Sequence, residues 1–192
     1  MGRLYGGFHS FRYAPQATQE KAPSWRQTDT RGTRVRDLRY ALAHQPTRGR
    51  ILSIWQKPIS VDELNSIHEG TAVRTLGIEF LHVGDDSITA RVPVDTRTRQ
   101  PYGLLHGGVS VVLAETLGSC GAAYSSPEGY RAVGLDINAN HIKGTTSGWV
   151  TGTARPVHIG RTTQVWQIDM KNDAGELTCV SRITMAVLAP RG

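Results

Sequence analysis

Residues 100–119 read QPYGLLHGGVSVVLAETLGS: one histidine and two glycines stand ahead of an apolar run that carries a single acid, Glu115. Apolar residues in this run recur at spacings of three and four, which is the period of an α-helix. The pattern predicts one long helix over residues 106–124. Its small residues, such as Gly118 and Gly121, allow close approach of neighbouring backbone, so the helix is expected to be largely buried. A carboxylate in such a helix needs an explanation, because burying an unpaired charge is costly.

Stretches on both sides of this helix predict β-strands. Residues 76–83 and 87–94 are strand-like and are joined by Gly-Asp-Asp, which is a hairpin signal. Ser60 and Glu63 have the spacing of a helix capping box, which predicts a short helix before the first strand. Four more strand-like runs follow the long helix, at residues 131–141, 148–159, 161–171 and 176–188. The predicted fold class is α+β, with an antiparallel sheet that wraps around one helix.

The first 53 residues differ from the rest of the chain in charge and texture. They hold ten Lys or Arg and three acids, a net charge of +7, whereas residues 54–192 carry a net charge of −1. They show no sustained helical or strand period, apart from a short helix predicted around residues 35–44. The sequence therefore predicts a basic, disordered N-terminal extension at 1–53 and a single domain at 54–192.

Three interpretations of the extension stay open. An Arg-rich leader resembles an organelle transit peptide, but serine is sparse and three acids are present. A nucleic-acid-binding arm is disfavoured because aromatic residues do not recur on a periodic face. The preferred interpretation is an extension unrelated to the chemistry, which includes a mis-assigned start.

Composition excludes several other classes. No run approaches the ~18 apolar residues of a membrane span, and the N-terminus lacks the apolar core of a secretory signal. The two cysteines, Cys120 and Cys179, are far apart and form no CxxC pair, so a reducing, cytoplasmic location is expected. No ligand spacing for a metal, no G-x-S-x-G motif and no glycine-rich nucleotide loop occurs, so neither metal nor cofactor is expected.

Several blocks of the sequence carry a family resemblance. Residues 106–115, HGGVSVVLAE, resemble the HGG-x6-E element of hotdog-fold acyl-CoA thioesterases of the 4-hydroxybenzoyl-CoA thioesterase type. Further blocks are similar to those of bacterial 1,4-dihydroxy-2-naphthoyl-CoA thioesterases of menaquinone synthesis and of enterobactin proofreading thioesterases. They are HVGDD (82–86), PVDTRTRQPYGLLHGG (93–108), GLDINANH (134–141) and QVWQI (164–168). The resemblance covers residues 54–188 and implies a hotdog fold that hydrolyses an aromatic acyl-CoA to a free acid and coenzyme A.

The resemblance also implies roles for particular residues. Gly107, at the start of the helix, would offer its N–H to the thioester carbonyl oxygen, in agreement with the unpaired amides of a helix N-terminus. Glu115 would act as nucleophile or as general base, and both alternatives stay open. Gln100 would orient the water or the carbonyl, and His106 would lie near the thioester. Residues expected to bind substrate are Gly108, Ser119, Cys120 and His141.

The implied partners are an acyl-CoA substrate and a second copy of the chain. Glu115 lies eight residues from Gly107, or about 12 Å along a helix, so one chain cannot easily bring both to one carbonyl. The resemblance implies a homodimer or homotetramer with shared active sites and no nucleic-acid or membrane partner. Two alternatives stay open: an acyl carrier protein as the bearer of the thioester, and a non-catalytic acyl-CoA-binding module, which Glu115 disfavours.

Overall fold

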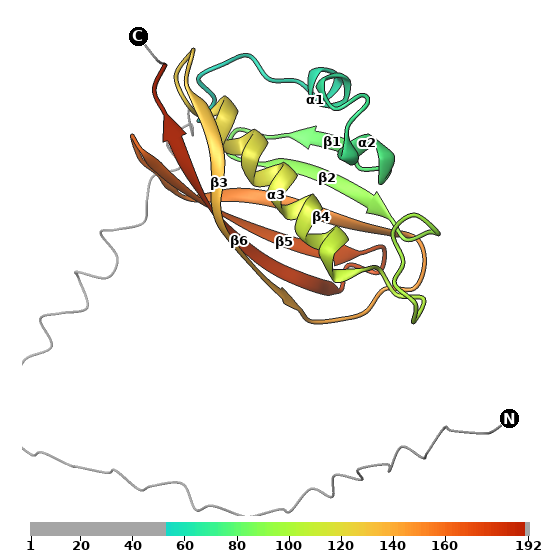
Figure 1. The fold of residues 1–192 in the computed structure, drawn as a ribbon. Coiled ribbons are helices and arrows are strands. Elements are labelled where there is room, and N and C mark those ends of the chain that lie inside the picture. The colour runs from blue at the N-terminus through green and yellow to red at the C-terminus, as the bar shows by residue number, and fades with distance from the viewer. Residues whose placement is uncertain (1–52, 191–192) are drawn as a thin grey trace, which may run out of the picture. The chain divides into compact units, whose positions relative to one another are not determined.

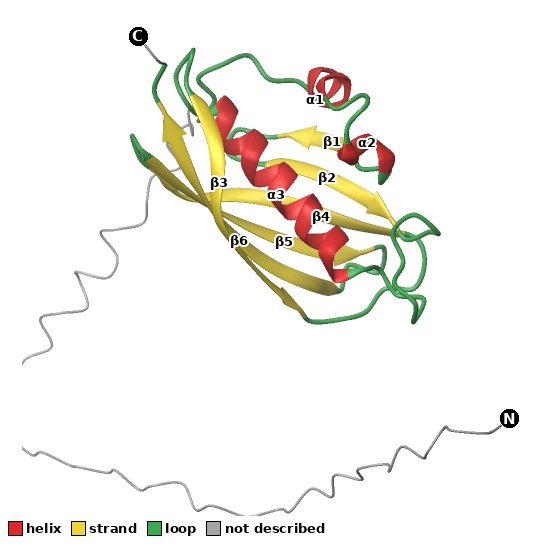
Figure 2. Cartoon of the chain, viewed as in Figure 1, coloured by secondary structure: helices red, strands yellow, loops and turns green. Residues whose placement is uncertain are grey.

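The computed structural model of the chain describes residues 53–190 (Figures 1 and 2). The predictions of a disordered extension and of a short helix at residues 35–44 lie outside the described residues. Within residues 53–190, no helix has the length and apolar character that crossing a membrane requires.

Six antiparallel strands form one sheet in the order β1-β2-β4-β5-β6-β3. The strands are β1 (Glu79–Val83), β2 (Ile88–Pro93), β3 (Arg131–His141), β4 (Trp149–Ile159), β5 (Thr163–Asn172) and β6 (Leu177–Leu188). All six predicted strands are present. The predicted hairpin turn between β1 and β2 is confirmed, with the Gly84 amide donating to the Ser87 carbonyl at 2.8 Å. Burial alternates along the first half of β4 and along most of β5, so one face of the sheet is packed against the core.

The predicted long helix is α3 (Gly107–Tyr124), and it runs across the face of the sheet (Figure 1). It packs against strands β2 to β6, and its side chains Leu113 and Leu117 are fully buried. A Cβ at Gly118 would lie 2.3 Å from Cγ2 of Ile183, so only glycine permits this approach of helix and sheet. The sheet wrapped around one central helix confirms the predicted α+β hotdog architecture.

Two short helices precede the sheet, α1 (Val61–Ile67) and α2 (Ala72–Thr75). The Ser60 hydroxyl accepts from the Glu63 amide at 3.1 Å, which confirms the predicted cap of α1. The Glu63 carboxylate accepts from the Tyr124 hydroxyl at 2.9 Å, and this contact joins α1 to the end of α3. The sequence analysis did not predict α2, whose four residues are too few to show a helical period.

The two edges of the sheet differ in length and cover. β1 has five residues and contacts α1, whereas β3 has eleven residues and pairs only with β6. On β3, Val133 is 44% exposed and Leu135 is 64% exposed. A β-bulge between Gly134 and Asp136 interrupts the pairing of β3 with β6 at this point. The β3 edge is therefore long and partly apolar, a type of edge that proteins usually cover.

Candidate active site

A tight turn fixes Gln100 in front of α3. The Gly103 amide donates to the Gln100 carbonyl at 2.8 Å, and the Gln100 amide donates to the Leu104 carbonyl at 2.8 Å. Pro101 suits the second position of this turn, and Gly103 adopts a φ of +79°, which glycine tolerates without strain. The Gln100 side chain thus projects from the first residue of a hydrogen-bonded turn.

The N-terminus of α3 presents one unpaired amide close to this turn. His106 is the N-cap residue, and its Nδ1 accepts from the Gly108 amide at 2.9 Å. A neutral His106 therefore carries its proton on Nε2. Gly107 is the first helical residue, so its N–H has no acceptor within the helix. The Gly107 amide, unlike that of Gly108, is available to an oxyanion.

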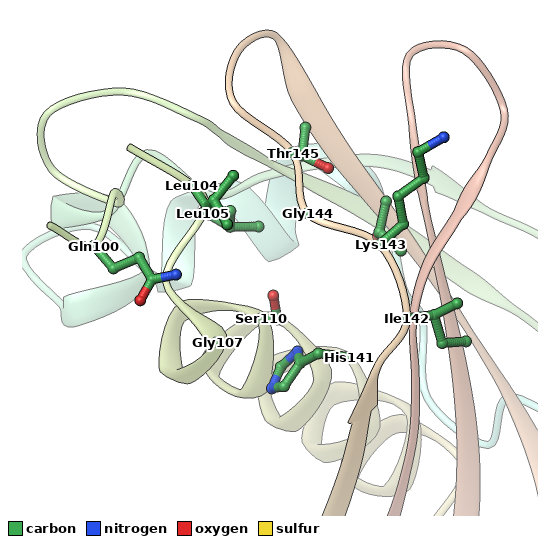
Figure 3. Close-up of a pocket in the computed structure, with 11 residues that line it drawn as sticks. Gln100, Leu104, Leu105, Gly107, Ser110, His141, Ile142, Lys143, Gly144 and Thr145 are labelled. Atoms are coloured by element: carbon green, nitrogen blue, oxygen red, sulfur yellow. The ribbon is translucent and has the colours of Figure 1, made fainter. Parts of the chain in front are cut away.

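A cavity of about 360 Å³ opens at this end of the helix (Figure 3). Its lining comes from the loop before α3, the first turns of α3, the loop after β3 and the start of β6. The lining residues are Gln100, Leu104, Leu105, Gly107, Ser110, His141, Ile142, Lys143, Gly144, Thr145 and Thr178. Figure 3 shows the Ser110 hydroxyl pointing from α3 into this space and the Lys143 side chain pointing away from it. Three of the residues singled out from the sequence, Gln100, Gly107 and His141, therefore meet in one cavity.

The imidazole of His141 lies directly against Gly107. A Cβ built on Gly107 would be 2.8 Å from Nε2 of His141, closer than real Cβ atoms approach other atoms. The absence of a side chain at Gly107 thus makes room for the ring as well as for a ligand. His141 is the last residue of β3, so the sheet positions this ring over the helix start.

Glu115 lies outside this cavity, on the exposed side of α3. Its Oε1 is 3.2 Å from the position that a Cβ on Gly134 would occupy, so the carboxylate rests against the backbone of β3 beside the bulge. Among the described residues, Glu115 takes part in none of the side-chain hydrogen bonds or ion pairs. Bulges are frequent next to active sites, where they re-aim the chain.

The remaining predicted substrate-binding residues lie apart from the cavity. Gly108 is exposed, and Ser119 is half-buried one turn after Glu115. Cys120 packs in the core, and burial raises the pKa of its thiol to about 12, so the thiol is protonated at neutral pH. Within one chain, the cavity is therefore lined by Gln100, Gly107 and His141. Glu115, Ser119 and Cys120 lie outside it.

Sequence reasoning missed several lining residues. Thr145 and Thr178 belong to no motif, Ser110 occupies an unspecified position of the HGG-x6-E element, and only the fold brings the three to the cavity. The chain contains many serines and threonines, so nothing in the sequence distinguishes these three. Ser110 follows Gly107 by three residues, and this helical spacing is the single signal that could have placed it on the same side of α3.

Comparison with known proteins agrees with this fold. A model of the Thioesterase superfamily matches residues 102–179. The chain is 50% identical over 136 residues to the 1,4-dihydroxy-2-naphthoyl-CoA hydrolase of Escherichia coli K12. The matched region covers 70% of this chain and 99% of that protein. It is 44% identical over 135 residues to the proofreading thioesterase EntH of Cronobacter turicensis, covering 70% of this chain and 98% of the relative.

Solved structures support the same assignment. The crystal structure of a thioesterase from Haemophilus influenzae superposes with a TM-score of 0.70 at 49% identity, covering 71% of this chain and 95% of that chain. A mutant thioesterase from Pseudomonas aeruginosa gives a TM-score of 0.70 at 47% identity, with 71% and 99% coverage. This chain therefore belongs to the thioesterase superfamily and is a thioester hydrolase with the hotdog fold.

Proposed function

We propose that the protein hydrolyses an aromatic acyl-CoA to the free acid and coenzyme A, with dihydroxynaphthoyl as the leading acyl candidate. One observation carries the proposal. The unpaired amide of Gly107 opens into a cavity beside Gln100, on the same helix as the unpaired carboxylate of Glu115. The similarity to an E. coli enzyme named for dihydroxynaphthoyl-CoA supports the acyl group. The two buried, free cysteines fit a reducing compartment such as the cytoplasm.

The chemistry follows from the charges that develop during thioester cleavage. Attack on the carbonyl carbon places negative charge on its oxygen, and the Gly107 N–H at the positive end of α3 would stabilise that charge. The Gln100 amide would orient the carbonyl or the attacking water from the same cavity. Glu115 would either attack the carbon, forming a mixed anhydride that water then hydrolyses, or remove a proton from an attacking water. In both routes the C–S bond breaks and the thiolate of coenzyme A leaves.

We infer that each site takes Gly107 from one chain and Glu115 from another. Eight residues of helix separate them, about 12 Å at ~1.5 Å per residue, which one thioester carbonyl cannot bridge. The exposed side of α3 that carries Glu115 has no covering element among the described residues (Figure 2). The β3 edge beside Glu115 is also uncovered. A second copy placed there in antiparallel orientation would cover both surfaces and bring its own Gly107 to Glu115.

A panel of thioesters tests the substrate class. Purified protein would be assayed with benzoyl-CoA, dihydroxynaphthoyl-CoA and a long-chain acyl-CoA, using a dye that reports the free thiol. We expect the highest kcat/KM with the aromatic esters. A preference for the long-chain ester would contradict the proposal. An aryl group on a holo carrier protein belongs in the panel, because the Cronobacter relative is named a proofreading thioesterase. A higher kcat/KM on the carrier would make proofreading the better assignment.

Subunit mixing tests the shared site. Gln100→Ala and Glu115→Ala proteins would be unfolded, mixed in equal amounts and refolded together. Half of the random pairs are then mixed, and each mixed pair holds one intact site, so about a quarter of wild-type activity should return by two-fold symmetry. Each variant refolded alone is the control. If activity does not rise in a sample shown by mass spectrometry to contain mixed pairs, each chain builds its own site.

A further inference from the structure

The cavity wall contains a buried hydroxyl without a partner. Thr145 lies on the loop between β3 and β4 and is 8% exposed, and its Oγ1 has no hydrogen-bond partner among the described residues. Among the described residues, Thr145 Oγ1 is the sole buried side-chain oxygen or nitrogen that lacks a hydrogen-bond partner. Thr145 is also one of the residues that line the cavity next to Gly107 (Figure 3).

Hydrogen bonds hold the loop that carries Thr145 at the cavity. The Thr145 carbonyl accepts from the Leu105 amide at 2.8 Å. The Arg99 guanidinium donates to the Thr146 carbonyl at 2.9 Å and to the Val94 carbonyl at 3.2 Å. These bonds tie the Thr145 loop to the loop that precedes α3, so the two loops form one wall. Burying an unpaired hydroxyl costs free energy, which a ligand that supplies the missing bond would recover.

The walls of the cavity suit a flexible chain that contains amides. The aliphatic side chains of Leu104, Leu105 and Ile142 share the lining with the Ser110 hydroxyl. Thr145 is also a lining residue, but its Oγ1 is buried beneath the cavity surface. No Phe, Tyr or Trp side chain is among the described residues that line it, and the imidazole of His141 is the one aromatic ring in that lining. The loop residues 142–144 are exposed, so the cavity leads outward to solvent.

A thioester bound at Gly107 extends in two directions from its carbonyl. One is the acyl group, and the other is the pantetheine arm, whose two amides are separated by methylene groups. The arm must reach solvent because it carries a nucleotide or a carrier protein at its far end. The mixture of aliphatic and hydroxyl groups and the open loop both match the arm. A rotation of the Thr145 side chain about its Cα–Cβ bond would turn the hydroxyl into the cavity.

We infer that the Thr145 hydroxyl forms a hydrogen bond with an amide of the pantetheine arm and so helps to select pantetheine thioesters. This inference rests on the proposed function. Pantetheine is common to coenzyme A and to holo carrier proteins, so the contact would serve both kinds of substrate. Thr145 acts here in binding and specificity, with no part in the bond-breaking step.

The test compares Thr145→Val with Thr146→Val. Valine keeps the shape of threonine and removes the hydroxyl, and Thr146 is an exposed neighbour outside the cavity lining, which makes it the matched control. Thr145→Val should lower kcat/KM roughly three- to tenfold for benzoyl-CoA and for benzoyl-loaded carrier protein, mainly through KM. S-ethyl thiobenzoate has no amide, and its hydrolysis should be unchanged. Thr146→Val should leave all three substrates unaffected.

Binding and stability give two further measurements. Calorimetry with phenacyl-CoA, an inert thioether, should show the same three- to tenfold weaker binding by Thr145→Val. The free variant should melt at or above the wild-type temperature, since it loses an unpaired buried hydroxyl. A lower melting temperature would mean that the hydroxyl already has a partner, such as a water, in the free protein and would overturn the inference.

The remaining outcomes are also decisive. Equal losses on S-ethyl thiobenzoate and benzoyl-CoA, a loss confined to the coenzyme A ester, or unchanged phenacyl-CoA binding would each overturn the pantetheine contact. Failure of the proposed function has a different signature: the wild-type protein would cleave none of the aryl esters. In that case the phenacyl-CoA binding comparison still decides whether Thr145 contacts the arm.

Discussion

The two halves of the proposed site are built in different ways. At the start of α3, backbone hydrogen bonds of a turn position Gln100, and Gln100, Gly107 and His141 of one chain line the same cavity. In the middle of α3, Glu115 is exposed and rests against Gly134 on an uncovered edge strand. One chain supplies every residue of the cavity at the start of α3. Glu115, in contrast, has no hydrogen-bond or ion-pair partner among the described residues. In the proposed assembly, the exposed acid on the apolar helix α3 would be completed by a second copy of the chain.

Replacing Glu115 should give the largest effect on activity. Glu115→Gln keeps the size of the side chain and removes its charge, so it can neither attack the thioester nor accept a proton. We expect kcat to fall at least about a hundredfold and KM to change little. Steady-state kinetics measure this, and an unchanged melting temperature shows that the fold is intact. A variant with near-normal kcat would show that the carboxylate half of the site has been misassigned.

A charge on the β3 edge should disrupt assembly of the protein. Leu135→Lys places an ammonium on the edge proposed to pair with a second copy, and edge lysines prevent strand pairing. Sedimentation velocity should show smaller particles, and most of the thioesterase activity should be lost. Leu81→Lys is the matched control, because Leu81 is 42% exposed on β1 at the opposite edge of the same sheet. Equal effects of the two variants would contradict assembly through β3.

A methyl group at position 134 should displace the Glu115 carboxylate. Its Cβ would lie 3.2 Å from Oε1 of Glu115, so the carboxylate must shift by a few tenths of an ångström. Gly134→Ala should lower kcat roughly tenfold, because small displacements of a reacting group are costly. In the double variant with Glu115→Gln, the alanine should cause no further loss. An additional loss in the double variant would mean that Gly134 acts on something other than Glu115.

Removal of residues 1–52 should have the smallest effect. The cavity and Glu115 both lie within residues 53–190. The E. coli relative is matched over 99% of its length by 70% of this chain, so that protein manages without a comparable extension. We expect kcat/KM and the melting temperature of the truncated protein to match those of the full chain. A large fall in either would show that the extension packs on the domain.

Much of the fold was predictable because the relevant signals are local. The period of α3, the alternation in β5 and the cap at Ser60 depend on residues a few positions apart. The site was predictable only through motifs. Gln100 and Gly107 flank one turn and belong to one block, whereas His141 reaches the same cavity from a strand that begins 24 residues after Gly107. No local pattern indicates that its ring lies on Gly107.

The long helix, the six strands and the acid at position 115 could all be read from the amino-acid sequence, because periodicity and turn chemistry act between near neighbours. Three features could be found only in the folded chain: His141 lies against Gly107, Gly134 leaves room for Glu115, and the Thr145 hydroxyl is buried without a hydrogen-bond partner among the described residues. These facts depend on how the end of β3, its bulge and the following loop lie against α3. Contacts between elements distant in the chain are set by packing, and packing has no local signature in the sequence.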